Sequence, residues 1–466
     1  MKHPKVFKSI LSAAIAFGMA TTLQPAAAES NDKRNVILII GDGMDDTQVT
    51  IGRNYLEGAQ GRLVIDNMPY RGAVQVLTVH ENDPSKFIYV ADSANSATSM
   101  ATGAITSRGR IGTSAKDDKD LTTIAEMAKT SGFATGIVST ANVTDATPAS
   151  FVAHVSSRGC ENPDMMVNAE AFAGVIVDCS ADTKALGGKG SIAEQIADAD
   201  IDVVLGGGQK HFNKNAEAMP KPLFTVAQDN NYQYITKAKQ LAQVNPNQKL
   251  LGLFSESTMP VRMQGENGRG SEAPKPSFLN KVDWRVGDVE MPAPMKCEAN
   301  PEFEGMPNLR DMTAAAISHL DARSANGFFL MVESASIDKQ SHARKPCGQI
   351  GEMQQLDESL KVALDFAKEN PNTLILVTAD HGQAAQILPD GSLFNAMPVA
   401  VYPMGMVSRI ITPEGQIMAV NYATTPHGFP IEEHTGTTVP LYSNQPIPAM
   451  LTQPEIFNLL KDHLQL

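Results

Sequence analysis

The chain has 466 residues, of which 38 are Lys or Arg, 51 are Asp or Glu, and 42% are hydrophobic. A net charge of −13 excludes a protein that binds nucleic acid through a basic face, and the ordinary composition excludes a disordered, collagenous or coiled-coil chain. Because an acidic chain repels anions at long range, any phosphate chemistry here needs local positive charge from metal ions or a well-placed arginine.

The first 28 residues have the features of a secretory signal peptide. Three lysines lie within the first eight residues, 10–20 is a mostly apolar run too short to cross a bilayer, and 26–28 are three alanines. A buried N-terminal helix is the alternative interpretation. We therefore predict an exported protein, periplasmic or secreted, with no membrane span in the mature chain.

Short aliphatic runs alternate with helical patterns along the mature chain. The runs predict buried strands at 36–40, 87–90, 134–139, 202–205, 328–332 and 374–377. Small or periodically apolar residues predict helices at 93–103, 122–129, 308–322 and 353–370. This alternation predicts an α/β fold, a large and mostly parallel central sheet with helices on both faces. Two stretches show no clear pattern: the insertion-rich 209–294, with a surface insertion at 265–276, and 400–448.

Polar side chains follow most of the predicted strands, where ligands bind in open α/β sheets. These residues are Asp42, Asp92, Ser93, Asp145, Thr147, Glu333, Asp338, His342, Asp380 and His381. Asp338 and His342 are four residues apart, so on a helical turn they face the same way and can share one metal ion. Asp380 and His381 converge only if the chain turns after them, as we expect before Gly382.

Ser93 and His434 extend this candidate site. The N–H groups at the start of the helix predicted after Ser93 suit a phosphate, although an ordinary capping serine is the alternative. We assign His434 as a further imidazole ligand, although by itself it is typical of a surface histidine. The remaining histidines of the mature chain have no clear carboxylate partner in the sequence. We predict structural roles for His80, His154, His211, His319, His427 and His463.

The four cysteines of an exported chain predict disulfides. They are Cys160, Cys179, Cys297 and Cys347, which allow three pairings. The sequential pairing closes the shortest loops. A four-cysteine zinc site is the alternative, but the chain lacks the CxxC spacing that such sites use.

Eight short motifs lie in order between about Asn35 and His434. They are Gly41-Asp42-Gly43-Met44, Asp92-Ser93-Ala94, Asp145-Ala146-Thr147-Pro148-Ala149, His154-Val155-Ser156-Ser157-Arg158, Val332-Glu333, Ser336-Ile337-Asp338-Lys339-Gln340-Ser341-His342, Thr378-Ala379-Asp380-His381 and Glu433-His434-Thr435-Gly436. Together they resemble the bacterial alkaline phosphatases of the periplasmic type. The sequential cysteine pairs also resemble the disulfides of that family.

The resemblance implies two zinc ions and one magnesium ion per chain. The residues that match the first zinc site are Asp338, His342 and His434. Those that match the second zinc site are Asp42, Asp380 and His381. Those that match the magnesium site are Asp42, Thr147 and Glu333. Asp145 and Lys339 match a neighbouring pair that favours magnesium over a third zinc, because neither is an imidazole.

The same resemblance implies an activity and its machinery. It implies hydrolysis of small phosphate monoesters through a phosphoserine on Ser93, releasing inorganic phosphate, with transfer to alcohols as a side reaction. Arg158 matches the residue that clamps the phosphate, and Asp92 would orient it. Homodimers are also implied. The alternatives are a phosphodiesterase or sulfatase of the same superfamily, and a phosphate- or metal-binding protein without turnover.

Three positions depart from the pattern of the family. Gln383 stands where several relatives carry a further histidine, Ser341 stands where relatives often carry an acid, and Ser334 replaces a common glycine. None of them removes a proposed metal ligand. We therefore expect them to alter metal affinity and pH optimum rather than the chemistry.

Overall fold

A computed structural model describes residues 33–172, 175–217, 219–283, 285–390, 405–426 and 428–466. The predicted signal peptide and His427 lie outside these described residues. Among the helices that they form, none has both the length and the apolar composition needed to cross a bilayer.

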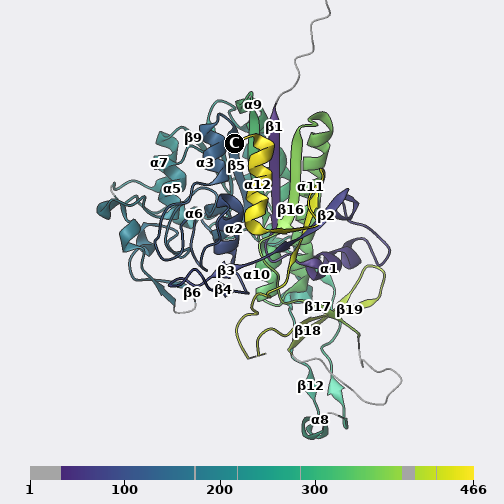
Figure 1. The fold of residues 1–466 in the computed structure, drawn as a ribbon. Coiled ribbons are helices and arrows are strands. Elements are labelled where there is room, and N and C mark those ends of the chain that lie inside the picture. Colours follow the sequence, from purple (N-terminus) through teal and green to yellow (C-terminus); the bar gives the residue numbers. More distant parts are fainter. Residues whose placement is uncertain (1–32, 173–174, 218, 284, 391–404, 427) are drawn as a thin grey trace, which may run out of the picture. The chain divides into compact units, whose positions relative to one another are not determined.

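A ten-stranded sheet forms the centre of the fold (Figure 1). Across the sheet its strands are β21 (Met450–Thr452), β2 (Tyr70–Gln75), β20 (Val439–Ser443), β16 (Thr373–Ala379), β1 (Arg34–Gly41), β15 (Gly327–Ser334), β5 (Ala134–Asn142), β8 (Val203–Gly207), β10 (Lys249–Leu253) and β9 (Tyr232–Ile235). The strands from β16 to β9 are parallel, whereas β20 is antiparallel to both of its neighbours. The central strands β15, β5 and β16 are buried along their whole length, which explains their continuous apolar sequences.

Helices cover both faces of this sheet, as the sequence predicts (Figure 1). One group packs on β1, β15, β16 and β5 and consists of α9 (Leu309–Arg323) and α11 (Pro346–Glu369). The other group packs on β1, β15 and β5 and consists of α3 (Ile124–Thr130), α4 (Ala146–Ala149) and α12 (Gln453–Leu464). The helix α2 (Ser93–Thr102) packs on α12 and α4 of this group. The remaining α-helices are α1 (Asp46–Leu56), α5 (Ile192–Asp198), α6 (Gln209–Phe212), α7 (Leu223–Asp229), α8 (Phe278–Val282) and α10 (Ser336–His342). The α/β architecture predicted from the sequence is confirmed.

Five of the six predicted strands are confirmed as β1, β5, β8, β15 and β16, and the prediction of a sixth at 87–90 is wrong. That segment forms β4 (Phe87–Ile88), which pairs only with β3 (Thr78–Val79). Phe87 is half exposed and Tyr89 is 75% exposed, so the run is not buried as a central strand would be. Ser93 therefore follows a surface loop rather than a central strand.

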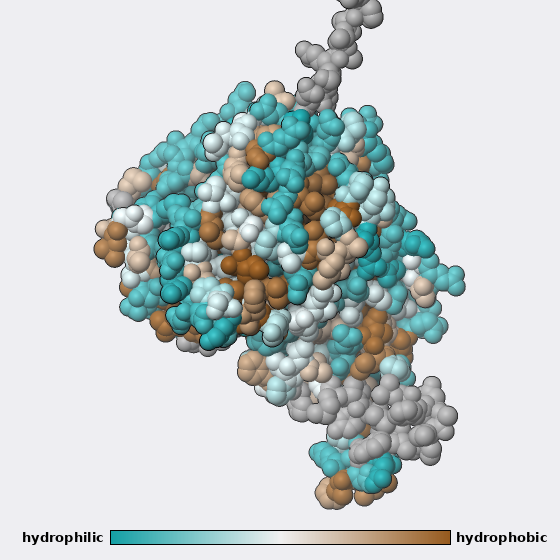
Figure 2. Space-filling view, in the orientation of Figure 1, coloured by the Kyte–Doolittle hydropathy of each residue, from teal (hydrophilic) through white to brown (hydrophobic). Residues whose placement is uncertain are grey.

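The stretch 209–294 contains more regular structure than its sequence indicates. It supplies α7 and the strands β9 and β10, which complete one edge of the central sheet. The surface insertion predicted at 265–276 continues into a short hairpin, β12 (Lys275–Pro276) and β13 (Val289–Glu290), with α8 between its strands. The apolar side chains Phe278, Leu279 and Val282 of α8 are each more than half exposed, and Figure 2 shows apolar surface where Figure 1 labels α8.

A smaller sheet and two disulfides lie outside the central sheet. The small sheet is antiparallel and contains β17 (Gln386–Leu388), β19 (Ile417–Tyr422) and β18 (Met406–Ile411). Further short strand pairs are β6 (Ala169–Phe172) with β7 (Val175–Val177), and β11 (Met263–Gly265) with β14 (Cys297–Ala299). The disulfides join Cys160 to Cys179 and Cys297 to Cys347, so the sequential pairing is confirmed and the four-cysteine zinc site is excluded.

Candidate active site

Most of the predicted site residues lie at or soon after the ends of four neighbouring strands at the centre of the sheet. The strands β5, β15, β1 and β16 lie side by side and are parallel, so their carboxyl ends meet at one edge. Asp42 follows β1, and Glu333 lies near the end of β15. Asp380 and His381 follow β16, and Asp145 comes soon after β5. The pairing of strands thus gathers side chains from distant parts of the sequence.

The turn after β1 brings the chain close to α10. Gly43 has a φ of 67°, and a Cβ added there would lie 3.0 Å from the Cβ of Asp338. The Gly43 N–H donates to Oδ1 of Asp380 at 3.0 Å. A larger residue at this position would therefore crowd Asp338, one of the proposed metal ligands.

A first cluster forms around Asp338. On α10 the i, i+4 spacing brings Nε2 of His342 to 3.2 Å from Oδ2 of Asp338, as the sequence predicts. His434 lies on a loop that is distant in sequence. Its Nε2 lies 3.0 Å from Nε2 of His342 and 3.6 Å from Oδ1 of Asp338. These ligand atoms lie within 4.8 Å of one another, a spacing that a single metal ion can bridge.

A second cluster forms around His381 and includes the serine. Nε2 of His381 lies 3.4 Å from Oδ1 of Asp42, 3.3 Å from Oδ2 of Asp380 and 3.1 Å from Oγ of Ser93. Asp338 also reaches this group, so the two clusters share a carboxylate. Ser93 is the first residue of α2, where the helix exposes free N–H groups.

Each imidazole of the two clusters is oriented by its other nitrogen. The Nδ1 atoms of His342, His381 and His434 each contact a backbone carbonyl. The carbonyls belong to Glu432, Gly382 and Ala91, respectively. Because a carbonyl can only accept, the neutral imidazole carries its proton on Nδ1 and leaves the Nε2 lone pair free. This arrangement is the one that orients metal-binding histidines in proteins.

A third group surrounds Asp145 and contains cations in place of imidazoles. Lys339 donates to Oδ2 of Asp145 at 2.5 Å, and Arg158 donates to Oδ1 at 2.9 Å. Asp145 caps α4, on which the hydroxyl of Thr147 is buried. Glu333 is near enough for the charge of Asp145 to act on it, and it accepts a hydrogen bond from Ser139 at 2.5 Å.

Asp92 connects the serine helix to the arginine. Its carboxylate caps α2 by accepting from the Asn95 N–H at 3.1 Å. The same carboxylate accepts from Arg158 at 3.4 Å. The Arg158 side chain is about one-third exposed, so its guanidinium can meet a substrate between Asp92 and Asp145.

Several carboxylates of the site lie close together, so their negative charges are poorly balanced unless a cation binds. Burial, together with Asp380 and Asp338, raises the pKa of Asp42 well above its usual range. Burial and the charge of Asp145 raise the pKa of Glu333 to about 8. Burial also opposes ionisation of Asp338, but His342 and His434 outweigh it and hold the pKa of that carboxyl well below its usual range.

The chemistry of the donor set fits bound metal ions. The buried atoms Oδ1 of Asp42, Oδ2 of Asp380 and Oγ1 of Thr147 have no hydrogen-bond partner among the described residues. Buried polar atoms are almost always satisfied, so three unpartnered atoms at one edge of a sheet indicate a missing partner. Since two of the atoms are carboxylate oxygens, a cation fits as that partner.

Comparison with known proteins shows the family to which this chain belongs. The family model described as alkaline phosphatase matches residues 33–436, well over half of the chain. The chain belongs to the alkaline phosphatase family. It is therefore a phosphomonoesterase, a hydrolase, and its His and Asp clusters correspond to the metal-binding character of that family.

Individual relatives match nearly the whole chain. The alkaline phosphatase of Escherichia coli K12 is 40% identical over 93% of this chain and 86% of that protein. The streptomycin-6-phosphate phosphatase of Streptomyces griseus is 39% identical over 91% of this chain and 89% of that protein. Among solved structures, an alkaline phosphatase from the Antarctic bacterium TAB5 matches with a TM-score of 0.65, covering 93% of this chain and 99% of that chain, and at 21% identity it supports the fold alone.

Sequence reasoning missed several contacts around this alkaline phosphatase site. Ser139 lies within β5 beside Glu333, and the general rule that ligands gather at strand ends could have pointed to it. Gln383 donates to Oδ1 of Asp338 at 2.6 Å. The departure from the family pattern drew attention to Gln383 but did not identify this contact.

The prediction that the remaining histidines lack carboxylate partners is wrong for two of them. Nε2 of His154 lies 2.9 Å from Glu126, and Nε2 of His211 lies 3.0 Å from Glu161. The members of each pair are far apart in sequence, so spacing gave no sign of them. Both histidines are buried, and neither belongs to the metal-ligand clusters.

Proposed function

We propose that this alkaline phosphatase hydrolyses small phosphate monoesters in two steps, through a phosphoserine on Ser93. The observation that carries the proposal is the position of the serine, which is the first residue of α2 with its Oγ at 3.1 Å from Nε2 of His381. A phosphate held there would meet both the free N–H groups of the helix and the cluster of imidazoles and carboxylates.

The proposed chemistry moves one phosphoryl group twice. In the first step the group passes from the ester oxygen to Oγ of Ser93, which loses its proton, and the alcohol leaves. In the second step water attacks the phosphorus of the phosphoserine and inorganic phosphate leaves. An added alcohol can take the place of water and receive the phosphoryl group. Two in-line displacements give net retention at phosphorus.

Arg158 is the proposed phosphate clamp. Its planar guanidinium can donate to two phosphate oxygens at once, which an ammonium cannot do in the same geometry. Asp92 and Asp145 hold the guanidinium from two sides, at 3.4 and 2.9 Å. The clamp is therefore oriented before the substrate arrives, which lowers the cost of ordering it on binding.

We propose two zinc ions and one magnesium ion per chain. The first zinc would be held by Asp338, His342 and His434, and the second by Asp42, Asp380 and His381. The magnesium would be held by Asp42, Thr147 and Glu333, with Asp145 and Lys339 beside it. Imidazole with carboxylate suits zinc, whereas hydroxyl and carboxylate oxygens suit magnesium. When bound, these ions supply Lewis-acid stabilisation of the attacking and leaving oxygens.

Trapping of the phosphoserine tests the mechanism directly. Enzyme quenched in acid after brief exposure to labelled substrate should carry the label on Ser93. Ser93→Ala keeps the proposed metal ligands and Arg158, so it should retain a low residual rate. Its kcat should nevertheless fall by several orders of magnitude, up to the roughly 10⁶-fold known for removal of a serine nucleophile.

Ser96→Ala is the matched control for this experiment. Ser96 lies on the same helix, and its buried hydroxyl has no hydrogen-bond partner among the described residues, so its loss should change kcat little. An unlabelled Ser93, together with near-normal activity of Ser93→Ala, would mean that water attacks the substrate directly.

A comparison of substrates separates the proposal from its alternatives. The enzyme should turn over p-nitrophenyl phosphate far faster than bis(p-nitrophenyl) phosphate or p-nitrophenyl sulfate. Preference for the diester or the sulfate would favour those activities, and failure to turn over any of the three would favour a binding protein.

Export and assembly remain part of this proposal. We propose that residues 29–466 form the catalytic domain, that the mature protein is periplasmic or secreted, and that it is a homodimer. The two disulfides agree with an oxidising compartment. Terminal sequencing of the exported protein would locate the cleavage site, and light scattering would give its oligomeric state.

A further inference from the structure

Arg158 lies in a loop that has no regular structure of its own. The loop runs from α4 to Cys160, and the arginine side chain is about one-third exposed. A displacement of about 1 Å in a substrate-positioning group can cost about 10²-fold in rate. The backbone beneath Arg158 must therefore be fixed by contacts from elsewhere in the fold.

One set of contacts joins the loop to the segment 109–112. Val155 and Ile111 exchange two backbone hydrogen bonds, at 2.9 and 3.1 Å, and the Arg158 N–H donates to the Gly109 carbonyl at 2.7 Å. The Gly109 N–H in turn donates to the carboxylate of Asp92. The backbone of Arg158 and the partner of its side chain are thus fixed by the same segment.

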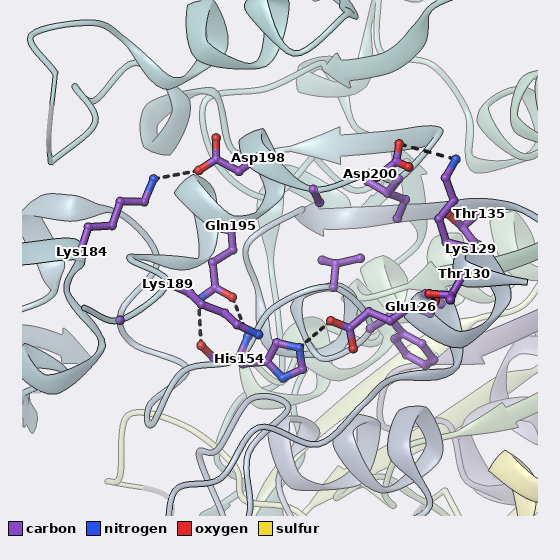
Figure 3. Close-up of a pocket in the computed structure, with 16 residues that line it drawn as sticks. Glu126, Lys129, Thr130, Thr135, His154, Lys184, Lys189, Gln195, Asp198 and Asp200 are labelled. Atoms are coloured by element: carbon purple, nitrogen blue, oxygen red, sulfur yellow. Dashed lines mark hydrogen bonds and ion pairs between the residues drawn. The ribbon is translucent and has the colours of Figure 1, made fainter. Parts of the chain in front are cut away.

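Gln195 of α5 holds the beginning of the loop from the other side. Its side-chain amide donates to the His154 carbonyl at 2.7 Å and accepts from the His154 N–H at 2.9 Å, as a neighbouring strand would. The same amide donates to the Gly190 carbonyl at 2.9 Å. Figure 3 shows Gln195 directed at the His154 backbone, and both residues are buried.

The imidazole of His154 adds two further anchors. Its Nδ1 lies 2.9 Å from the Gly112 carbonyl, and its Nε2 lies 2.9 Å from Glu126. Since both partners are acceptors, both ring nitrogens donate only when the imidazole is protonated. Glu126 also accepts from the Thr123 N–H at the start of α3. The ring therefore ties the loop to α3 and to the segment 109–112 at once.

We propose that Gln195 and His154 are positioning residues for Arg158, and that they act by fixing the backbone of 154–158 from the side away from the substrate. The proposal rests on the proposed role of Arg158 as the phosphate clamp. It extends the phosphate-binding machinery from the arginine to a pair of buried polar side chains that do not touch the substrate.

The surroundings of these residues allow a clean test. Gln195, His154 and Glu126 form part of the wall of a cavity of about 750 Å³ (Figure 3). Because solvent can enter this space, a change at Gln195 does not leave a sealed void. On the same wall, Lys184 pairs with Asp198 at 2.8 Å, and this pair has no part in holding the loop.

A double-mutant cycle distinguishes positioning from general stability. Gln195→Met keeps the length of the side chain but lacks both hydrogen bonds to His154. We expect it to lower kcat/KM for p-nitrophenyl phosphate, and to raise the inhibition constant of inorganic phosphate, by about tenfold. In an Arg158→Ala background the same change should have almost no further effect, because the group it positions is absent.

Further variants and the thermal midpoint complete the experiment. Gln195→Glu keeps the acceptor for the His154 N–H but sets an oxygen against the carbonyls of His154 and Gly190, so it should lose at least as much as Gln195→Met. Gln195→Leu, which also lacks these hydrogen bonds, replaces Gln195→Met if that variant does not fold. Asp198→Asn, on the same wall, should leave phosphate inhibition unchanged. Equal losses in the presence and absence of Arg158 would overturn the positioning role. Unchanged phosphate inhibition in Arg158→Ala alone would instead contradict the proposed function.

Discussion

The carboxylates of Asp338 and Asp145 are balanced by their neighbours in two different ways. Asp338 faces imidazoles, the nearer being His342 with its Nε2 at 3.2 Å. Asp145 faces permanent cations, Lys339 at 2.5 Å and Arg158 at 2.9 Å. Burial alone would raise the pKa of either carboxyl, yet both pKa values lie below their usual range because of these partners.

The difference would allow one edge of a sheet to hold the two kinds of metal ion proposed above. An imidazole can give up its proton and become a ligand, whereas an ammonium or guanidinium group stays charged at neutral pH. Around Asp145 the donors left for a metal are therefore oxygens, which suit a hard cation. Burial, together with the charge of Asp145, raises the pKa of Glu333 to about 8, and the charge of Lys339 only partly offsets this shift.

Removal of metals should have the largest effect. Chelation should lower activity to near the background rate, because both clusters would then lose the ions that are proposed to stabilise the reacting oxygens. Zinc alone should restore most of the activity and magnesium should raise it further, if the imidazole cluster and the oxygen donors differ as proposed. Metal analysis and rates measured after each addition test this prediction. A metal-free preparation with full activity would contradict it.

The sequence was sufficient for the centre of the fold and for much of the site. Strands such as β1 and β15 are buried on both faces, so their aliphatic runs stand out, and polar residues at their ends predicted where ligands gather. The i, i+4 spacing of Asp338 and His342 likewise fixed their common orientation. The grouping of the residues into metal sites depended on the resemblance to the family.

The rest depended on contacts that leave no local pattern. The sequence of the edge strand β9 is polar enough to resemble that of a loop. Conversely, Tyr89 made the sequence of an exposed segment resemble that of a buried strand. The carbonyl that orients His434 belongs to Ala91, more than three hundred residues away. Such pairs form only when the whole sheet has assembled, so spacing along the chain cannot reveal them.

A change of the Asp145 surroundings should have the next largest effect. The double variant Asp145→His with Lys339→Trp introduces an imidazole and removes the ammonium group. The site should then prefer zinc and lose its stimulation by magnesium. Metal content and the response of the rate to added magnesium test the prediction, with each single variant as a control. Unchanged magnesium stimulation in the double variant would mean that these two residues do not select the ion.

The smallest effect should come from a change at Gln383, which hydrogen-bonds to Asp338 in the first cluster. Its amide donates to Oδ1 of Asp338 at 2.6 Å, so Gln383→Ala leaves that oxygen without a donor. We expect zinc affinity at the Asp338 cluster to fall by about tenfold, the lower end of what loss of such an orienting partner costs. Zinc titration in a chelator buffer measures the change, and the exposed Gln386→Ala is the control. Gln383→His can still donate an N–H and should recover part of the loss. If Gln383→Ala binds zinc as tightly as Gln386→Ala does, Asp338 is oriented by its imidazoles alone.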